Sequence, residues 1–336
     1  MNPFYSRFEK ASLKGAFFPV ELCPLYWKGE SKENKPKDIF DIQGYNLCPN
    51  NYAVVNMIDG NVFACVTKNY ALISNKQAYE KIGRHVACKV FGFQESIKFD
   101  ANNVYMSKTK GECIIDYSRY IEKNQPGIND GWQAFIRMEN SYNKTRKLSY
   151  TLGFMNLKEG AILSFNSLSI SVDSAHTGAL STIIGNIDRQ MYKKQSYKIC
   201  EIEEHFQRKL QILRTLPVAK EDIFPLFCKI FNISKPQRDI DKDDQAALLL
   251  CCQFIETKAE EMVKKYGKNA YSLLLVFAGY ANETNMASLY LYYDKAQASL
   301  GSWVDEYIEK AKEQDFSINQ YIGQKAADTA SWIRSL

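Results

Sequence analysis

The stretch that decides the fold is NSYNKTRKLSYTLGFMNLKEGAILSFNSLSISVDSAHTG, residues 140–178. Its second half alternates like a strand, with Leu168, Ile170 and Val172 on one face and serines on the other. A period of two residues is the pattern of a β-strand in a sheet with one buried face. Residues 141–145 are rich in turn-forming side chains. We therefore predict a turn at 141–145 that leads into an antiparallel strand pair.

Similar short runs occur on the N-terminal side of this stretch. They are rich in β-branched and aromatic residues, which favour strands, and they cover residues 52–57, 61–67, 70–75, 96–99, 103–109, 112–121 and 132–142. Asp59-Gly60 between the first two runs is a strong hairpin signal. Residues 75–91 instead show helical spacing, with Ala78, Ile82 and Val86 on one stripe and Ser74 or Asn75 as the N-cap.

The pattern changes to helical after residue 178. Apolar residues at helical spacing lead up to Pro217, which ends that helix. Further helices are predicted at 220–232, 245–267, 270–283 and 286–313, the last with a turn near Gly301. The acidic residues 239–244 precede the helix at 245–267 and are predicted to cap it, as part of a solvated linker.

Strands followed by helices predict an α+β fold, in which an antiparallel sheet in the N-terminal and central region precedes a mostly α-helical C-terminal region. We expect an irregular segment at 1–50, where prolines are frequent. A sheet-rich core with one helix should follow at 51–178, and a helical region that packs on or beside the sheet at 179–336.

Composition narrows the class of protein. The net charge of +5 over 336 residues permits a nucleic-acid partner without requiring one. Nine scattered cysteines without a CxxC pair are typical of reduced, mostly buried thiols in a cytoplasmic protein, and they predict no metal site. Residues 1–15 lack the order of a signal peptide, and no apolar run has the length of a membrane span, so no membrane contact is expected.

Sequence motifs for catalysis are absent. The chain has no GxSxG, HExxH, P-loop or GxGxxG pattern, so neither a cofactor nor a catalytic residue is predicted. Of the three histidines, His85 and His205 fall in predicted helices, whereas His176 follows a strand. An enzyme that uses His176 as acid or base, beside Asp173, is the weakest of three alternatives.

Cations interleaved with tyrosines are the more informative feature. One group lies in 137–150 and a second in 189–198. Lysine and arginine contact phosphates, and tyrosine rings stack on bases. We therefore predict that nucleic acid is bound by Arg137, Tyr142, Lys144, Arg146, Lys147, His176, Arg189, Lys193 and Lys194. The alternative is a solvent-exposed hairpin with ordinary lysines.

The order of four motifs in this chain resembles that of the phage/plasmid-like protein family. The motifs are NYALISNKQAYEKI (69–82), IRMENSYNKTRKLSYTLGFMNLKEGAILSF (136–165), HTG (176–178) and AYSLLLVFAGYANE (270–283). This is a domain of unknown function found on phages, plasmids and integrated elements. Asn143-Lys144 stands where that family has Asp-Gly. The resemblance implies a mobile-element setting and no established activity.

Two functions fit these observations better than catalysis. The first is a nucleic-acid-binding protein of a phage or plasmid, with single strands as its partner, an annealing or replication accessory role and a homo-oligomeric state. The second is a phage-encoded interaction factor that acts on a host defence or regulatory complex without catalysis. Its partner would be a host or phage protein.

Overall fold

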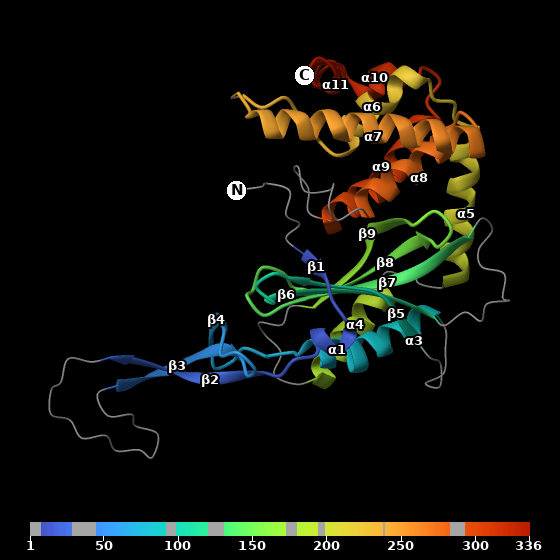
Figure 1. The fold of residues 1–336 in the computed structure, drawn as a ribbon. Coiled ribbons are helices and arrows are strands. Elements are labelled where there is room, and N and C mark those ends of the chain that lie inside the picture. Colours follow the sequence, from blue (N-terminus) through green and yellow to red (C-terminus); the bar gives the residue numbers. More distant parts are fainter. Residues whose placement is uncertain are drawn as a thin grey trace.

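The computed structural model describes residues 8–28, 45–91, 99–119, 131–172, 180–193, 199–237, 239–282 and 293–336. Its centre is an antiparallel six-stranded sheet in the order β1-β5-β6-β7-β8-β9. These strands are β1 (Phe8–Lys10), β5 (Phe99–Ser107), β6 (Glu112–Arg119), β7 (Trp132–Ser141), β8 (Leu148–Asn156) and β9 (Ala161–Val172). Helices follow in the C-terminal region (Figure 1). The predicted α+β class is confirmed.

A second sheet forms an arm that projects from the body of the protein (Figure 1). It consists of β2 (Val20–Lys28), β3 (Tyr45–Asn56) and β4 (Val62–Thr67), paired antiparallel in the order β2-β3-β4. The predicted Asp59-Gly60 hairpin joins β3 to β4, with Gly60 at φ 75° and its N–H on the Asn56 carbonyl at 2.9 Å. We call β2, β3 and β4 the arm.

The arm differs from the irregular segment that the prolines of residues 1–50 predict. Pro24 and Pro49 both lie in strands, β2 and β3. The β2–β3 register shifts between Pro24 and Tyr26, where residues 48–51 of β3 stand opposite Leu25. Proline has no N–H to donate and is tolerated at such bulges. The strand predicted at 70–75 is wrong, because 70–74 precede a helix that Ser74 caps.

The helix predicted at 75–91 is confirmed as one continuous run. It comprises α2 (Asn75–Gln77), a π-helical turn η1 (Ala78–Gly83) and α3 (Arg84–Phe91). Ala78, Ile82 and Val86 are buried. Two tyrosines of the sheet donate to carbonyls at the ends of η1, Tyr150 to Ala78 at 2.7 Å and Tyr117 to Gly83 at 2.9 Å. Hydrogen bonds from outside the helix accompany the wider π turn.

The remaining helices lie on both sides of the sheet. Helices α1 (Leu13–Ala16) and α4 (Leu180–Lys193) share one side with α3, while α8 (Ala270–Asn282) and α9 (Tyr293–Lys310) lie beside β9 (Figure 1). Helix α5 (Ile199–Thr215) runs from the sheet towards an outer group made up of α6 (Ile223–Ile230), α7 (Lys242–Tyr266), α10 (Ile318–Ile322) and α11 (Gln324–Arg334). As predicted, Asp241 caps α7, Gly267 ends it, and α5 ends just before Pro217.

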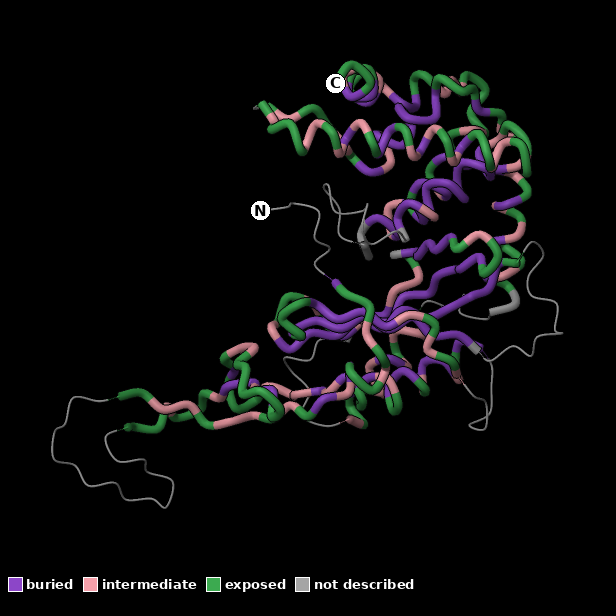
Figure 2. The backbone as a smooth tube through the Cα atoms, viewed as in Figure 1, coloured by how far each residue is buried: buried purple, intermediate pink, exposed green. Residues whose placement is uncertain are grey.

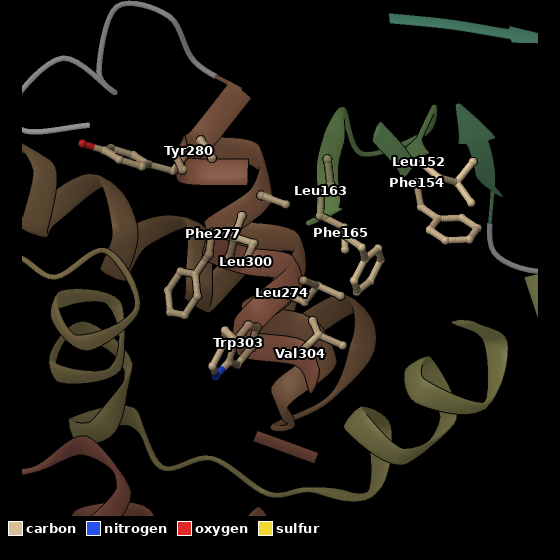
Figure 3. Close-up of a cluster of buried hydrophobic side chains, with 14 of the residues drawn as sticks. Leu152, Phe154, Leu163, Phe165, Leu274, Phe277, Tyr280, Leu300, Trp303 and Val304 are labelled. Carbon is tan, nitrogen blue, oxygen red and sulfur yellow. The ribbon is translucent and has the colours of Figure 1, made fainter. Parts of the chain in front are cut away.

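The apolar core is continuous from the sheet into the helices. Leu163 and Phe165 of β9 lie against Leu274 of α8 and against Leu300 and Val304 of α9 (Figure 3). The central strands are buried along nearly their whole length, whereas the arm is largely exposed or half-buried (Figure 2). Burial on both faces of β7 and β8 corrects the expectation of one buried face. On the second face, Arg137 of β7 pairs with Asp116 of the neighbouring strand β6, as described below, and Phe135, Met155 and Ile162 form a small apolar cluster.

Gly301 lies inside α9, so the turn predicted there is wrong. A Cβ placed on Gly301 would lie 2.0 Å from the Ser164 carbonyl oxygen and 3.2 Å from the Phe165 ring. Glycine is therefore required by the close approach of α9 to the backbone of β9, and it does not mark a turn. This contact seats the helical region on the last strand of the sheet.

Replacing Gly301 by alanine should lower the free energy of unfolding by about 1–3 kcal/mol, because overpacking against backbone forces α9 away from β9. Gly279 of α8 is a matched control, since a Cβ there meets nothing within 4 Å. Gly279→Ala should raise stability by up to about 1 kcal/mol through helix propensity. Urea denaturation measures both, and an unchanged midpoint for Gly301→Ala would contradict the contact.

Candidate nucleic-acid interface

Two turns lie side by side at one end of the six-stranded sheet. The Tyr142 N–H of the β7–β8 turn donates to the Gly111 carbonyl of the β5–β6 turn at 2.8 Å. A Cβ on Gly111 would lie 2.9 Å from Asn143 Nδ2. The arm meets both turns, because Lys144 Nζ donates to the Cys65 carbonyl at 2.6 Å and Lys110 Nζ to Asp59 Oδ2 at 3.3 Å.

Four exposed lysines project from these turns: Lys108, Lys110, Lys144 and Lys147. We call this set the basic edge. Asp59 lies beside this edge, where its Oδ2 accepts a hydrogen bond from Lys110 Nζ at 3.3 Å. The Asn61 N–H and, less strongly, Lys110 lower the pKa of Asp59, which keeps it ionised at neutral pH. The surface therefore carries a local excess of positive charge, which suits phosphate.

Internal hydrogen bonds fix the β7–β8 turn. Asn143 Oδ1 accepts from Thr145 N–H at 3.2 Å and from its hydroxyl at 2.6 Å. Ser141 Oγ donates to the Arg146 carbonyl at 2.7 Å and accepts from its N–H at 3.0 Å. Lys144 adopts a left-handed φ of 62°. The predicted turn at 141–145 is confirmed, and its hydrogen bonds hold the backbone between Lys144 and Lys147 in place.

Tyr142 has a structural position. Its side chain is 1% exposed, its ring stacks on Phe63 of β4 with centroids 5.4 Å apart, and its hydroxyl accepts from the Asn75 N–H at 2.8 Å. Burial raises the pKa of this tyrosine. Asn140 donates to the Asn75 side chain at 2.9 Å and joins the same network. Tyr142 links the turn to the start of α2, and its ring is not accessible to a base.

Arg137 is also internal. Its guanidinium donates two hydrogen bonds of 2.7 Å to Asp116, and both side chains are almost completely buried. Arg137 and Asp116 stand opposite each other on β7 and β6. Asp116 was not identified from the sequence, because the signal, an acidic and a basic residue facing each other, exists only once the strand register is known.

Arg146 makes two ion pairs at the border of the basic edge. Its Nε lies 2.7 Å from Glu112 Oε2 and its Nη1 lies 3.3 Å from Glu139 Oε2. The guanidinium also lies over the Phe8 ring, 5.2 Å from the centroid. Through these contacts Arg146 links strands β1, β6 and β7. Only a small part of its side chain is exposed to solvent.

The second basic stretch begins on α4. Arg189 and Lys193 are exposed, and Tyr192 is 81% exposed. Gln190 Nε2 donates to the Ser171 carbonyl at 2.7 Å, and Ser171 pairs with Ser149, two residues beyond Lys147. The fold thus anchors α4 to the same end of the sheet as the β7–β8 turn. Lys194 and His176 lie outside the described residues.

Sequence reasoning missed Lys108, Lys110 and the aromatic residues of the arm. Trp27 is 55% exposed and Tyr45 is 44% exposed, on adjacent strands where Lys28 pairs with Tyr45. The sequence does show a basic turn at 108–111 and an aromatic run before residue 28. Neither pattern indicates on which surface of the folded protein these side chains lie. Exposed rings beside lysines are the residue types that contact single strands.

Other chemistry receives no support from the described side chains. Within the described ranges, no group of three His, Cys, Asp or Glu residues could hold a metal ion. Burial raises the pKa of Cys228 and Cys251 to about 12, so both are protonated and unreactive. His85 Nε2 lies 2.8 Å from Asp188 Oδ1 and joins α3 to α4. None of the described helices is long and apolar enough to cross a membrane.

Comparisons with protein-family models, with curated proteins and with solved structures find no match to this chain.

Removing Asp116 tests the internal role of Arg137. Asp116→Ala leaves the guanidinium buried without this carboxylate and should cost about 3–5 kcal/mol of unfolding free energy. The double variant Asp116→Leu/Arg137→Met should recover most of that loss. Urea denaturation measures stability. If the double variant folds but loses affinity for an oligonucleotide, Arg137 belongs to the interface after all.

Proposed function

We propose that this protein binds single-stranded nucleic acid on the basic edge, and that the strand continues along the arm to the exposed rings at its far end. The observation that carries the proposal is the convergence of lysines from the adjacent β5–β6 and β7–β8 turns. Phosphates would contact Lys108, Lys110, Lys144 and Lys147, and bases would stack on Trp27 and Tyr45. Arg189 and Lys193 of α4 would extend the path along the sheet end.

Single strands suit this surface better than a duplex. Exposed aromatic rings bind unstacked bases, whose faces a duplex hides. From the resemblance of its motif order to the phage/plasmid-like family, we further propose a mobile-element role such as annealing or replication. A homo-oligomer would be the working form for annealing.

Charge reversal at Lys108, Lys144 and Lys147 should lower affinity for a single-stranded oligonucleotide at least about tenfold at low salt. The slope of log K against log salt should fall by about two, since each lost phosphate contact removes about 0.7. Fluorescence anisotropy across a salt series measures both. Lys264, Lys268 and Lys325, exposed on and near α7 and on α11, form the control set. Equal losses in both variants would refute a local interface.

Removing the aromatic rings of the arm should lower the affinity for the oligonucleotide without changing the salt dependence, unlike charge reversal. Trp27→Ala combined with Tyr45→Ala should weaken binding by about thirtyfold or more, because each of the two stacked bases contributes about 1–3 kcal/mol, and the salt slope should stay constant. Leu157→Ala, an exposed apolar residue in the β8–β9 turn, is the control. A changed salt slope with unchanged affinity would contradict base stacking on the arm.

A second candidate function is binding to a host or phage protein. It is favoured by the apolar residues Met57, Ile58 and Val62, which are exposed around the β3–β4 hairpin. In that case the arm would dock on a defence or regulatory complex. Ile58→Ser should then abolish specific capture of a protein from host lysate while leaving oligonucleotide binding intact. Capture that survives this substitution would exclude the hairpin as the docking surface.

A further inference from the structure

Helices α1, α2–η1–α3 and α4 form one layer on the same side of the six-stranded sheet (Figure 1). Asn75 Nδ2 at the start of α2 donates to the Ala16 carbonyl of α1 at 3.0 Å. His85 Nε2 of α3 lies 2.8 Å from Asp188 Oδ1 of α4. These contacts join α1 to α2 and α3 to α4, so the outer surfaces of the helices belong to one face of the molecule. We call it the helical face.

The helical face concentrates the positive charge of the chain. Its helices carry seven exposed cations and two carboxylates. The cations are Lys14, Lys76, Lys81, Arg84, Lys89, Arg189 and Lys193, and the carboxylates are Glu80 and Asp188. This excess equals the net charge of +5 of all 336 residues. Helices α6, α7, α10 and α11 of the outer group are nearly balanced, with seven cations and six carboxylates. The positive field of the protein is therefore centred on one side of the sheet.

The two carboxylates of the helical face lie beside lysines of the same face. Glu80 Oε2 is 4.0 Å from Lys76 Nζ, and Asp188 Oδ1 is 3.9 Å from Lys89 Nζ. Each pair cancels one positive charge, and the excess remains with the other cations. Because all of these side chains reach solvent, the pairs contribute little to stability and their lysines can exchange a carboxylate for another anion.

A surface made almost only of cations suits a polyanion with dense and regular charge. Double-stranded nucleic acid carries one phosphate charge per about 1.7 Å of its axis. Lys76 and Lys89 lie 13 residues apart in the continuous run from α2 to α3. At the rise of a helix they are separated by about 20 Å, the length of about six base pairs. The helical backbone holds these cations at fixed positions, as the rigid phosphate rows of a duplex require.

The helical face offers little to a single strand or to a membrane. Single strands gain from exposed rings on which bases stack, and membranes gain from exposed apolar side chains that enter the lipid. Among the described helices of this layer, Tyr192 is the one exposed large hydrophobic residue, at 81%. A duplex requires neither feature, because its bases stack inside and its phosphates lie outside.

We propose that the helical face binds double-stranded nucleic acid through its phosphates, without reading the base sequence. The inference goes beyond the proposed function, because duplex binding on the helices does not require single-strand binding on the basic edge. Arg189 and Lys193 of α4 border both surfaces, so the test uses lysines of α2–η1–α3 instead.

Fluorescence anisotropy of the full chain with a labelled DNA duplex about 20 base pairs long, two helical turns, tests the proposal. Combined Lys76→Gln, Lys81→Gln and Lys89→Gln should lower duplex affinity at least about tenfold at low salt, because three phosphate contacts are lost. The slope of log K against log salt should fall by about two to three, since each duplex contact contributes about 0.9. Affinity for a single-stranded oligonucleotide should stay the same.

Two variants of equal charge serve as controls. Replacing the basic-edge lysines Lys108, Lys144 and Lys147 by glutamine should keep duplex affinity and lower single-strand affinity. The control set on the outer helices, neutralised in the same way, should leave both affinities unchanged. Loss of duplex binding in the helical-face variant alone would support the proposal even if no single strand binds to the basic edge, so the two claims can fail separately.

Three outcomes would overturn the proposal. The first is no duplex binding at low salt. The second is an equal loss of both ligands in the helical-face and basic-edge variants, which would make the two surfaces one site. The third is binding to phosphatidylserine vesicles that is tighter than duplex binding and is lost in the helical-face variant, which would assign the face to a membrane.

Lysine acetylation of the unaltered chain, followed by mass spectrometry, provides a test that needs no variant. Bound duplex should slow the acetylation of Lys76, Lys81 and Lys89, because phosphates cover their ammonium groups. Acetylation of the control set should continue at its free rate. Unchanged rates at the three helical-face lysines would contradict the proposal even if the glutamine variant does not fold.

Discussion

The close approach of α9 to β9 is the constraint on which the arrangement of the chain depends. At Gly301 the helix backbone reaches the Ser164 carbonyl, which no side chain would permit. That contact sets the depth at which Leu300 and Val304 enter the core beside Phe165. It also sets the position of Asp305, one turn further along α9, opposite Lys209 of α5. The seating of α9 on the sheet and its ion pair with α5 therefore share one cause.

At the other end of the sheet, arginines are buried and lysines are exposed, because the two side chains differ in geometry and hydration. Arg137 and Arg146 form close ion pairs with Asp116 and Glu112 inside the sheet, where a planar guanidinium matches a carboxylate. The strongly hydrated lysines remain outside, on turns whose backbone is fixed by Asn143 and Ser141. Internal pairing thus rigidifies the same hairpin that presents cations to solvent.

Local signals in the sequence predict much of the fold, and long-range contacts account for the failures. The Asp59-Gly60 hairpin, the helix at 75–91 and the cap at Asp241 depend on neighbouring residues, and each is confirmed. The sequence around Gly301 does not distinguish a turn from a close approach of a helix to a strand, because glycine suits both. The burial of Arg137 and Tyr142 depends on strand register and on packing against α2 and β4. The contact between the two basic turns depends on their adjacency in the sheet, which the sequence order does not state.

Hydrogen–deuterium exchange with and without a single-stranded oligonucleotide tests the central claim most directly, because it reports every surface at once. The account predicts slower exchange at residues 108–111 and 143–147 and in β2 and β3 when the oligonucleotide is bound. Unchanged exchange at those turns, or protection confined to α7, α10 and α11, would contradict it.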